Sequence, residues 1–344
     1  LRETLEPSSI SDPFLKMLLG MTVKEQQQPL QLLIQRNDFF MKGLSHSQCP
    51  FKHVELNTIS ASFPFLIERL MQIQIQHFQE DPLFLNSLVK NAPLEPIIDI
   101  ISESIRRYDS PESMMLTVIQ PGEANRFDQL GIEHRLWEKH GIRCLRKSLQ
   151  EIGENASIKQ GHLVLDQQTV SLVYFRAGYT PNDFIHPDAI KGRQLIEQSS
   201  AIQSPNLWMQ LAGMKKIQQT LTRAEVLTRY APSKYKDKIA STFVRMHALD
   251  DPVKDSNETL TALDLVLRKP EHCVLKPQRE GGGNNFFGQE MTELLINLDP
   301  GKFDSYILME RIQPPTHPAW LISRGKSELS QSVSEVGRYG ILLT

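Results

Sequence analysis

The segment Cys273–Asn285 combines the residue types that bind a phosphorylated ligand. It begins as a short apolar strand that ends at Lys276, and Glu280 and the glycines Gly281–Gly283 follow. Glycine lets backbone N–H groups approach phosphate oxygens because it has no Cβ, and a lysine ammonium neutralises phosphate charge. A carboxylate repels phosphates unless a cation lies between them, so Glu280 indicates Mg²⁺. A triple glycine by itself is usually a flexible loop, and the segment matches neither the P-loop nor the dinucleotide fingerprint.

A second candidate lies in the strand predicted for Phe51–Asn57. Glu55 and Asn57 are two residues apart, so their side chains project from the same face of a strand. Carboxylate and amide oxygens are suitable ligands for a shared Mg²⁺. An exposed strand edge explains most isolated Glu-x-Asn pairs equally well.

Two arginines follow predicted apolar strands. Arg36 comes after Leu32–Ile34, and Arg176 comes directly after Val170–Phe175. Arginine binds carboxylates bidentately, and a charge at the end of a buried strand needs a partner. Substrate binding, a solvated surface position for Arg36 and a structural salt bridge for Arg176 remain open on this pattern.

Strands and helices alternate between residues 111 and 213, which predicts a small parallel-sheet domain of Rossmann-like type. The expected strands and helices are Met115–Ile119, Arg126–His140, Gly141–Leu145, Val170–Phe175 and Ile190–Gln198. Ligands of such sheets bind beyond the carboxyl ends of the strands. The stretch Gln120–Gln129, which joins the first strand to its helix, is therefore a candidate binding segment.

The remaining chain is mostly helical with short strands. We expect a helix at Leu94–Arg107, a long helix from Trp208 to Tyr230, a helix at Thr259–Leu267 capped by Asp255 or Ser256, a short helix near Gln289–Leu298 and a strand at Tyr306–Met309.

Composition describes an ordinary globular chain. The 344 residues carry a formal net charge of -2, and 40% are hydrophobic, which suits one large or two medium domains. Near-neutral charge argues against a nucleic-acid partner, and no apolar run or signal peptide indicates a membrane. The scattered cysteines Cys49, Cys144 and Cys273 predict neither disulfides nor a zinc site. We expect free thiols and a cytoplasmic location.

Both ends of the chain suggest that flanking sequence is missing. The first residue is Leu1 rather than methionine, and the chain stops at Gly340–Thr344 inside an apolar stretch that predicts a strand.

Several motifs together resemble the eukaryotic-type glutathione synthetases, which are ATP-grasp ligases. The resemblance is carried by Lys276–Asn285 and Glu55–Phe63, and by the segments Gln120–Gln129, Tyr174–Tyr179, Gln210–Gln219, Ile307–Ile312 and Ser334–Gly337. These motifs cover nearly the full chain. The resemblance implies an α/β (α+β) fold: an ATP-grasp main body at residues 1–110 and 214–344, truncated at both ends, with an inserted Rossmann-like substrate-binding domain at residues 111–213.

The resemblance also implies roles for individual residues. Metal ligands would be Glu55, Asn57 and Glu280, holding one or two Mg²⁺. ATP would contact Lys215, Lys276, Gly281, Gly282, Gly283, Asn284, Asn285, Phe287, Met309, Ile312 and Glu335. Lys216 is the alternative register for Lys215. The substrate would contact Arg36, Ser60, Ser62, Glu123, Asn125, Gln129, Arg176 and Tyr179, and catalysis would rest on Arg36, Lys215 and Lys276.

The implied activity is the ATP- and Mg²⁺-dependent ligation of γ-glutamyl-cysteine to glycine through an acyl phosphate, carried out by a homodimer. Two departures from the family pattern stand out. Phe287 replaces an expected tyrosine in the nucleotide pocket, and the family's glycine- and alanine-rich closing loop has no counterpart. A non-catalytic homologue that binds nucleotide or peptide, and a sister ligase that uses β-alanine, are the alternatives.

Overall fold

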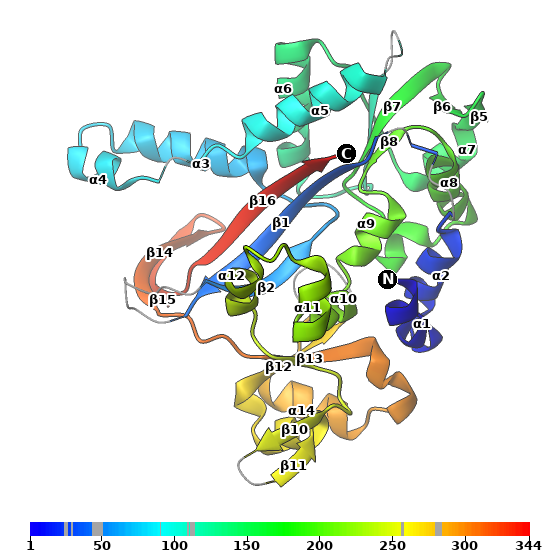
Figure 1. Cartoon of the computed structure of the whole chain (residues 1–344). Helices are drawn as coiled ribbons and strands as arrows, with labels where there is room; N and C mark the ends of the chain where they lie inside the picture. Colours follow the sequence, from blue (N-terminus) through cyan, green and yellow to red (C-terminus); the bar gives the residue numbers. More distant parts are fainter. Residues whose placement is uncertain are drawn as a thin grey trace. The chain divides into compact units, whose positions relative to one another are not determined.

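The computed structural model describes residues 1–23, 27–28, 30–42, 51–89, 91–108, 110, 114–255, 258–278 and 284–344 (Figure 1). The chain divides into two compact units. The first unit comprises Leu1–Leu19, Arg36–Asn57 and Leu211–Arg338, and the second comprises Gly20–Gln35, Thr58–Gln210 and Tyr339–Thr344. The described parts of these ranges are considered separately below.

The first unit is built around short antiparallel strands. Its central sheet has the order β12-β13-β9 and consists of β12 (Cys273–Pro277), β13 (Tyr306–Glu310) and β9 (Met246–His247). In this sheet Lys276 lies opposite Ile307 and Val274 lies opposite Met309. A core of Leu249, Val266, Leu275, Met291, Leu295 and Leu308 packs on one face, where α13 (Ala262–Arg268) and α14 (Gly288–Ile296) supply side chains.

A second sheet has the order β16-β1-β2. It contains β16 (Glu335–Leu343), β1 (Leu32–Met41) and β2 (Phe51–Asn57). Strands β1 and β2 are antiparallel, with Arg36 opposite Asn57 and Asp38 opposite Glu55, and a bulge follows Asp38. The bulge shifts the register by one residue and changes which side chains share a face.

The first unit has further helices and strands outside these two sheets. They are α1 (Arg2–Ser11), α2 (Pro13–Met21), α10 (Lys215–Leu221), α11 (Ala224–Tyr230), α12 (Lys236–Thr242), β10 (Pro252–Asp255), β11 (Glu258–Thr261), η2 (Pro270–His272), η3 (Pro300–Ser305), β14 (His317–Ser323) and β15 (Lys326–Ser332).

The second unit contains a six-stranded sheet of order β4-β3-β7-β6-β5, with β8 also paired to β7. Its strands are β3 (Met114–Val118), β4 (Cys144–Lys147), β5 (Ser157–Lys159), β6 (His162–Leu165), β7 (Gln168–Phe175) and β8 (Ile202–Ser204). Strands β4, β3, β7 and β8 are parallel, whereas β5 and β6 form an antiparallel edge. Parallel strands at the centre place the carboxyl ends of β3, β4 and β7 at one edge.

The helices of the second unit are α3 (Pro64–His77), α4 (Pro82–Ser87), α5 (Leu94–Tyr108), α6 (Arg126–His140), α7 (Leu149–Asn155), α8 (Pro187–Gln198) and α9 (Leu207–Ala212), with the 3₁₀ turn η1 (Pro181–Phe184). Ile97, Ile98 and Ile101 of α5 pack with Met115 and Leu172 of the sheet. The apolar face of α5 therefore covers the sheet.

The mixed α/β class and the parallel sheet are confirmed, and several element boundaries are corrected. The long helix expected at residues 208–230 is three helices, α9, α10 and α11, and the strand expected at residues 141–145 begins at Cys144. Helix α13 is capped by Thr261, which forms a capping box with Asp264, rather than by Asp255 or Ser256. Arg36 lies within β1 instead of after a strand.

The two units differ from the predicted domains in several segments: residues 20–35 and 339–344 belong to the second unit, and residues 211–213 belong to the first. Residues 58–110, which contain α3, α4 and α5, belong to the second unit together with the parallel sheet. The division into an ATP-grasp body and a substrate-binding domain stays a functional prediction. Among the helices of the described residues, none combines the length and apolarity needed to span a lipid bilayer.

Candidate functional site

Arg36 and Asp38 form the base of a charged cluster in the first unit. The Arg36 guanidinium donates to both carboxylate oxygens of Asp38, Nε to Oδ1 at 2.6 Å and Nη2 to Oδ2 at 2.7 Å. Asn57 donates through Nδ2 to Asp38 Oδ2 at 2.8 Å. The bidentate pair therefore fixes both the arginine and the amide on neighbouring strands.

Gly337 makes this arrangement possible from β16. A Cβ at residue 337 would lie 2.9 Å from Arg36 Cδ and 3.2 Å from Asp38 Oδ1. A larger side chain would have to displace the Arg36–Asp38 pair, so glycine is required here by close approach.

Two buried lysines lie near Glu55 on β2. Lys215, at the start of α10, is 3% exposed, and its Nζ lies 3.0 Å from Glu55 Oε2. Lys276 is 2% exposed and donates from Nζ to the carbonyl oxygen of Val54 at 2.9 Å. Lys216 instead reaches Asp304 at 3.1 Å. The first of the two adjacent lysines is thus the one that joins the cluster.

Burial and the neighbouring charges shift the pKa values of Glu55, Lys276 and His53. Burial opposes ionisation of Glu55, but the charges of Lys215 and Lys276 outweigh it and lower its pKa to about 2. Burial and then the charge of Lys215 lower the pKa of Lys276 to about 8. Burial and then the two lysines lower the pKa of His53 to about 4. Near neutral pH Glu55 is therefore ionised, Lys276 mostly carries its proton and His53 is neutral.

Glu335 lies at the start of β16 near the same charges. Partial loss of water and then the carboxylates of Asp38 and Glu55 raise its pKa. Its carboxylate thus belongs electrostatically to the cluster.

A cavity of about 290 Å³ lies beside Lys276 in the first unit. Several residues predicted to contact the nucleotide line it, namely Lys276, Asn285, Phe287, Met309 and Ile312. The other walls are largely apolar and include Phe40, Val54, Val274 and Val333. A planar apolar group fits such walls, with the lysine charge at one end.

Two of the three predicted metal ligands, Glu55 and Asn57, lie among the described residues. Glu55 Oε1 accepts from Asn57 Nδ2 at 3.3 Å, so a carboxylate and a side-chain amide lie side by side on β2. Their oxygens are the ligand type that Mg²⁺ prefers, and ionised Glu55 supplies negative charge. Glu280, Gly281, Gly282 and Gly283 lie outside the described residues. The convergence of Glu280 with Glu55 stays a prediction.

In the second unit, Arg176 is the centre of a buried hydrogen-bonded cluster. Its side chain is 0% exposed; Nη1 donates to the carbonyl oxygen of Ala61 at 2.8 Å, and Nη2 donates to Ser62 Oγ at 2.6 Å. Ser60 Oγ donates to the carbonyl oxygen of Arg176 at 3.1 Å. Arg176 thus ties the Ser60–Ser62 segment to the end of β7.

Ser60 itself has a φ of 54°, in the left-handed region that side chains other than glycine seldom adopt. Tyr339, from the last strand, also donates its hydroxyl to the carbonyl oxygen of Ser62. The segment is held in an unusual conformation from several sides, as residues at binding sites often are.

A series of hydrogen-bonded side chains links the start of α6 to β4. Gln129 Nε2 donates to Glu123 Oε2 at 2.6 Å, and Gln129 Oε1 accepts from Arg146 Nη2 at 2.7 Å. Arg146 also pairs with Glu133 at 2.6 Å. Because an amide has one donor end and one acceptor end, Arg146 fixes which end of Gln129 faces Glu123. Asn125 occupies the N-cap position of α6 but makes no capping bond with its side chain.

Asp183 connects the two loops that carry predicted substrate contacts. Its Oδ2 accepts hydrogen bonds from the backbone N–H groups of Gly178, Tyr179 and Thr180 at 3.0–3.1 Å, and its Oδ1 accepts from Gln120 Nε2 at 2.9 Å. Burial and then the charges of Glu123 and Asp183 raise the pKa of the Tyr179 hydroxyl. One carboxylate therefore anchors the loop after β7 to the loop after β3.

Sequence reasoning missed Asp38, Arg146 and Asp183. Thr180-Pro-Asn-Asp183 has the spacing of a capping box, which is a visible signal for Asp183. Asp38 lies two residues after Arg36, on the same face of a strand, but the pattern does not reveal the pairing. Nothing local marks Arg146, since its partner Gln129 belongs to another element.

Comparison with known proteins identifies the family. A sequence model described as "Eukaryotic glutathione synthase, ATP binding domain" matches residues 1–344. The chain belongs to this family. It is 34% identical over 361 residues to the chloroplastic glutathione synthetase of Solanum lycopersicum, covering 100% of this chain and 63% of that protein. It is 32% identical over 356 residues to the chloroplastic glutathione synthetase of Arabidopsis thaliana, covering 100% of this chain and 64% of that protein.

This member of the glutathione synthase family therefore spans less than two thirds of the length of these two plant relatives. Its fold is also similar to the solved structure of a glutathione synthetase like-effector from Globodera pallida in its apo form. The TM-score is 0.74 at 18% sequence identity, and the match covers 99% of this chain and 74% of that chain. The likeness supports the mixed α/β fold.

Proposed function

We propose that the protein is an ATP- and Mg²⁺-dependent ligase that joins γ-glutamyl-cysteine to glycine and forms glutathione. The observation that carries this proposal is the pair of buried lysines: Lys215 pairs with Glu55, and Lys276 donates to the carbonyl oxygen of Val54 and lines the apolar cavity of the first unit. Buried like charges are costly unless an anion neutralises them. A nucleoside triphosphate supplies that negative charge, and its planar base fits the apolar cavity.

The two steps of the reaction need positioning and charge rather than a protein nucleophile. The C-terminal carboxylate of the dipeptide attacks the γ-phosphorus of ATP, the bond to the bridging oxygen breaks, and ADP leaves. The glycine amine then attacks the acyl carbon of the resulting acyl phosphate, loses a proton to water, and inorganic phosphate leaves. Lys215 and Lys276 would stabilise the charge that develops on the phosphate oxygens.

Glu55 and Asn57 would hold Mg²⁺, together with Glu280. When bound, the ion supplies positive charge between the carboxylates and the phosphate oxygens. Arg36, held by Asp38, would add positive charge for an anionic ligand.

The second unit would bind γ-glutamyl-cysteine. Glu123 would supply a carboxylate for the α-ammonium. Asn125 and Gln129 follow β3, Arg176 and Tyr179 follow β7, and Ser60 and Ser62 lie in the segment that Arg176 holds, so these side chains would supply hydrogen bonds. Tyr179 lies close enough to Glu123 for that charge to affect its pKa. These contacts, the homodimer and the cytoplasmic location form part of the same proposal.

The test uses the purified chain. ATP binding is measured by calorimetry with MgCl₂, and phosphate release is then followed with γ-glutamyl-cysteine and glycine. We expect nucleotide binding, and phosphate release that rises when both substrates are present. A folded chain that binds no ATP contradicts the proposal.

The acceptor is tested in the same assay. Glycine and β-alanine are compared at equal concentration, and the tripeptide is identified by mass. Release of phosphate that is independent of any acceptor amine would indicate nucleotide hydrolysis without ligation.

A further inference from the structure

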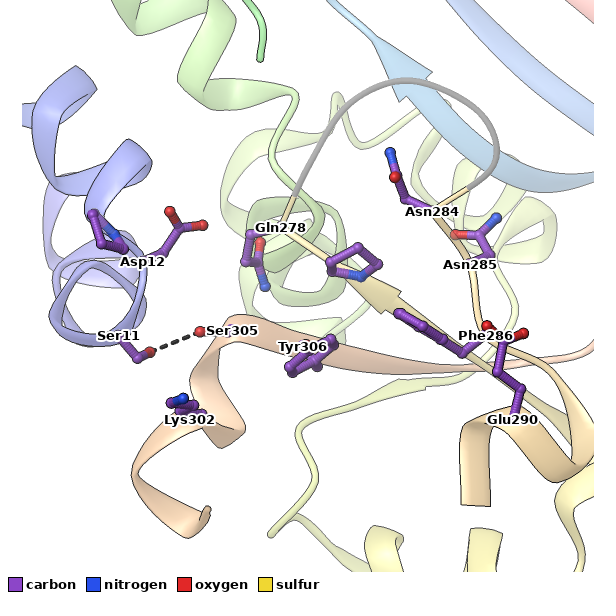
Figure 2. Close-up of a pocket in the computed structure, with 12 residues that line it drawn as sticks. Ser11, Asp12, Gln278, Asn284, Asn285, Phe286, Glu290, Lys302, Ser305 and Tyr306 are labelled. Carbon is purple, nitrogen blue, oxygen red and sulfur yellow. Dashed lines mark hydrogen bonds between the residues drawn. The ribbon is translucent and has the colours of Figure 1, made fainter. Parts of the chain in front are cut away.

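A separate cavity of about 390 Å³ lies within the first unit, shown in Figure 2. Its lining comes from the junction of α1 and α2, the end of β12, residues 284–286, helix α14, the 3₁₀ turn η3 and the start of β13. Among the described residues it shares only Asn285 with the cavity beside Lys276. Its volume falls in the range of small-molecule sites.

Gln278 offers a buried donor that has no hydrogen-bond partner among the described residues. The residue is 2% exposed, and its Oε1 accepts from the backbone N–H of Lys216 at 2.7 Å, which fixes the orientation of the amide. Its Nε2 makes no hydrogen bond to the part of the chain that the structure describes. Figure 2 shows this amide lying between Asp12 and Tyr306. A ligand acceptor atom would satisfy it.

Asp12 offers a buried acceptor. The residue is 8% exposed, and its Oδ1 accepts from the backbone N–H groups of Phe14 at 2.9 Å and Leu15 at 3.1 Å. These bonds start α2 and use one oxygen of the carboxylate. No bond to Oδ2 occurs within the described ranges, so this oxygen can accept from a cationic donor.

Two opposite charges and two rings complete the lining. Glu290 and Lys302 are exposed residues of the cavity, and neither forms an ion pair with another described residue. The rings of Phe286 and Tyr306 lie edge to face, with centroids 6.4 Å apart. The cavity thus combines carboxylates, an ammonium, an amide donor and an aromatic wall.

We propose that this cavity binds a free α-amino acid with an apolar side chain. The ligand ammonium would meet Asp12, and the ligand carboxylate would meet Gln278 Nε2 and Lys302; Glu290 lies at the opposite end of the cavity (Figure 2). A simple anion would face two carboxylates, and a simple cation would leave the Gln278 donor and Lys302 unmatched. A zwitterion answers both sets of groups, and its apolar side chain has Phe286 and Tyr306 to pack against.

The test compares L-leucine with two half-molecule analogues that each lack one charged group. 3-Methylbutylamine lacks the carboxylate, and 4-methylpentanoate lacks the ammonium. Binding to the full chain is measured by saturation-transfer NMR and calorimetry. We expect L-leucine to bind with a Kd of about 1 mM or tighter, and each half to bind at least about tenfold more weakly. No binding of L-leucine at about ten times that concentration overturns the proposal, as does equal binding of either half.

Asp12→Asn and Lys302→Met locate the site, with Lys326→Met on the exposed strand β15 as the matched control. Asparagine is also a good N-cap, so Asp12→Asn removes the charge while keeping the start of α2. Both variants should weaken L-leucine binding about tenfold or more, and the control should not. Unchanged binding in both variants overturns the proposal. ATP affinity is measured in parallel, so that failure here is distinguishable from failure of the proposed ligase function.

Discussion

The first unit and the second unit stabilise their buried charged side chains in different ways. In the first, Lys215, Lys276 and Glu55 are ionised groups held against one another under burial, and the pKa of Lys276 falls to about 8 as a result. In the second, Arg176 is equally buried but donates to a carbonyl oxygen and a hydroxyl. The first arrangement relies on buried charges of opposite sign, whereas the second relies on hydrogen bonds from a buried charge to uncharged groups.

The comparison implies that substitutions in the first unit change affinity through charge, and those in the second through position. Charge effects are larger and depend on pH and salt. Positional effects are smaller and fall on the dipeptide rather than on ATP.

The largest effect is expected for Lys276→Met and Lys215→Met. Each removes an ammonium that would meet phosphate, and a charged hydrogen bond contributes about 1.5–3 kcal/mol, or roughly 10- to 150-fold in ATP affinity. Calorimetry with Mg²⁺ and ATP measures the change. Lys216→Met is the control, because Lys216 pairs with Asp304. An equal loss of ATP affinity in Lys216→Met would contradict the assignment of the phosphate contact to Lys215.

The position of Lys276 could be predicted from the sequence, because an apolar run identifies a strand and its end, whereas Lys215 is assigned from the family resemblance. Lys276 follows an apolar run and lies near the end of β12, and the strand Phe51–Asn57 has its predicted bounds. Helix α6 also matches, since Gly141 adopts a φ of 65° and ends it as a left-handed C-cap.

What could not be predicted depends on contacts between distant residues. The segment at residues 208–230 keeps a helical pattern, yet it is divided into three helices at residues 213–214 and 222–223. Asp128 caps α3 from 62–65 residues away, accepting from the N–H groups of Phe63, Phe65 and Leu66. The bulge after Asp38 and the Arg146–Gln129 bond are likewise products of packing.

The next effect is a pH dependence of ATP binding. Because the pKa of Lys276 is lowered to about 8 in the free protein, the lysine loses its proton as the pH rises above that value. Binding to phosphate requires the proton, so ATP affinity should fall about tenfold by pH 9 and remain level from pH 7 to 7.5. Calorimetry across this range measures it.

Lys276→Met is the control for the pH profile, since it has no proton to lose at residue 276. A profile of equal slope in Lys276→Met and the natural chain would assign the titration to another group. A level profile in the natural chain would contradict the lowered pKa.

A smaller effect is expected in the second unit from Arg146→Met. Without Arg146, Gln129 can turn its amide and lose the donor that holds Glu123. The KM for γ-glutamyl-cysteine should rise severalfold to about tenfold, with ATP affinity unchanged. Steady-state kinetics with each substrate varied in turn separates the two.

Arg143→Met is the matched control, because Arg143 is an exposed arginine directly before β4, the strand that contains Arg146. A parallel fall in ATP affinity in Arg146→Met, or an equal effect in Arg143→Met, would show a general loss of stability.

The smallest effect is expected for Asp183→Asn. The amide keeps one acceptor oxygen but cannot hold both Gln120 and the three N–H groups that Asp183 now binds. The loop that carries Tyr179 should loosen, and the KM for γ-glutamyl-cysteine should rise about two- to fivefold, which corresponds to the loss of roughly one net hydrogen bond. Asp188→Asn, in the neighbouring helix, is the control. Because the change is positional, it should persist at high salt, whereas the contribution of Lys276 to ATP affinity should shrink. A salt-sensitive effect in Asp183→Asn would mean that its charge, rather than the loop geometry, acts on the substrate.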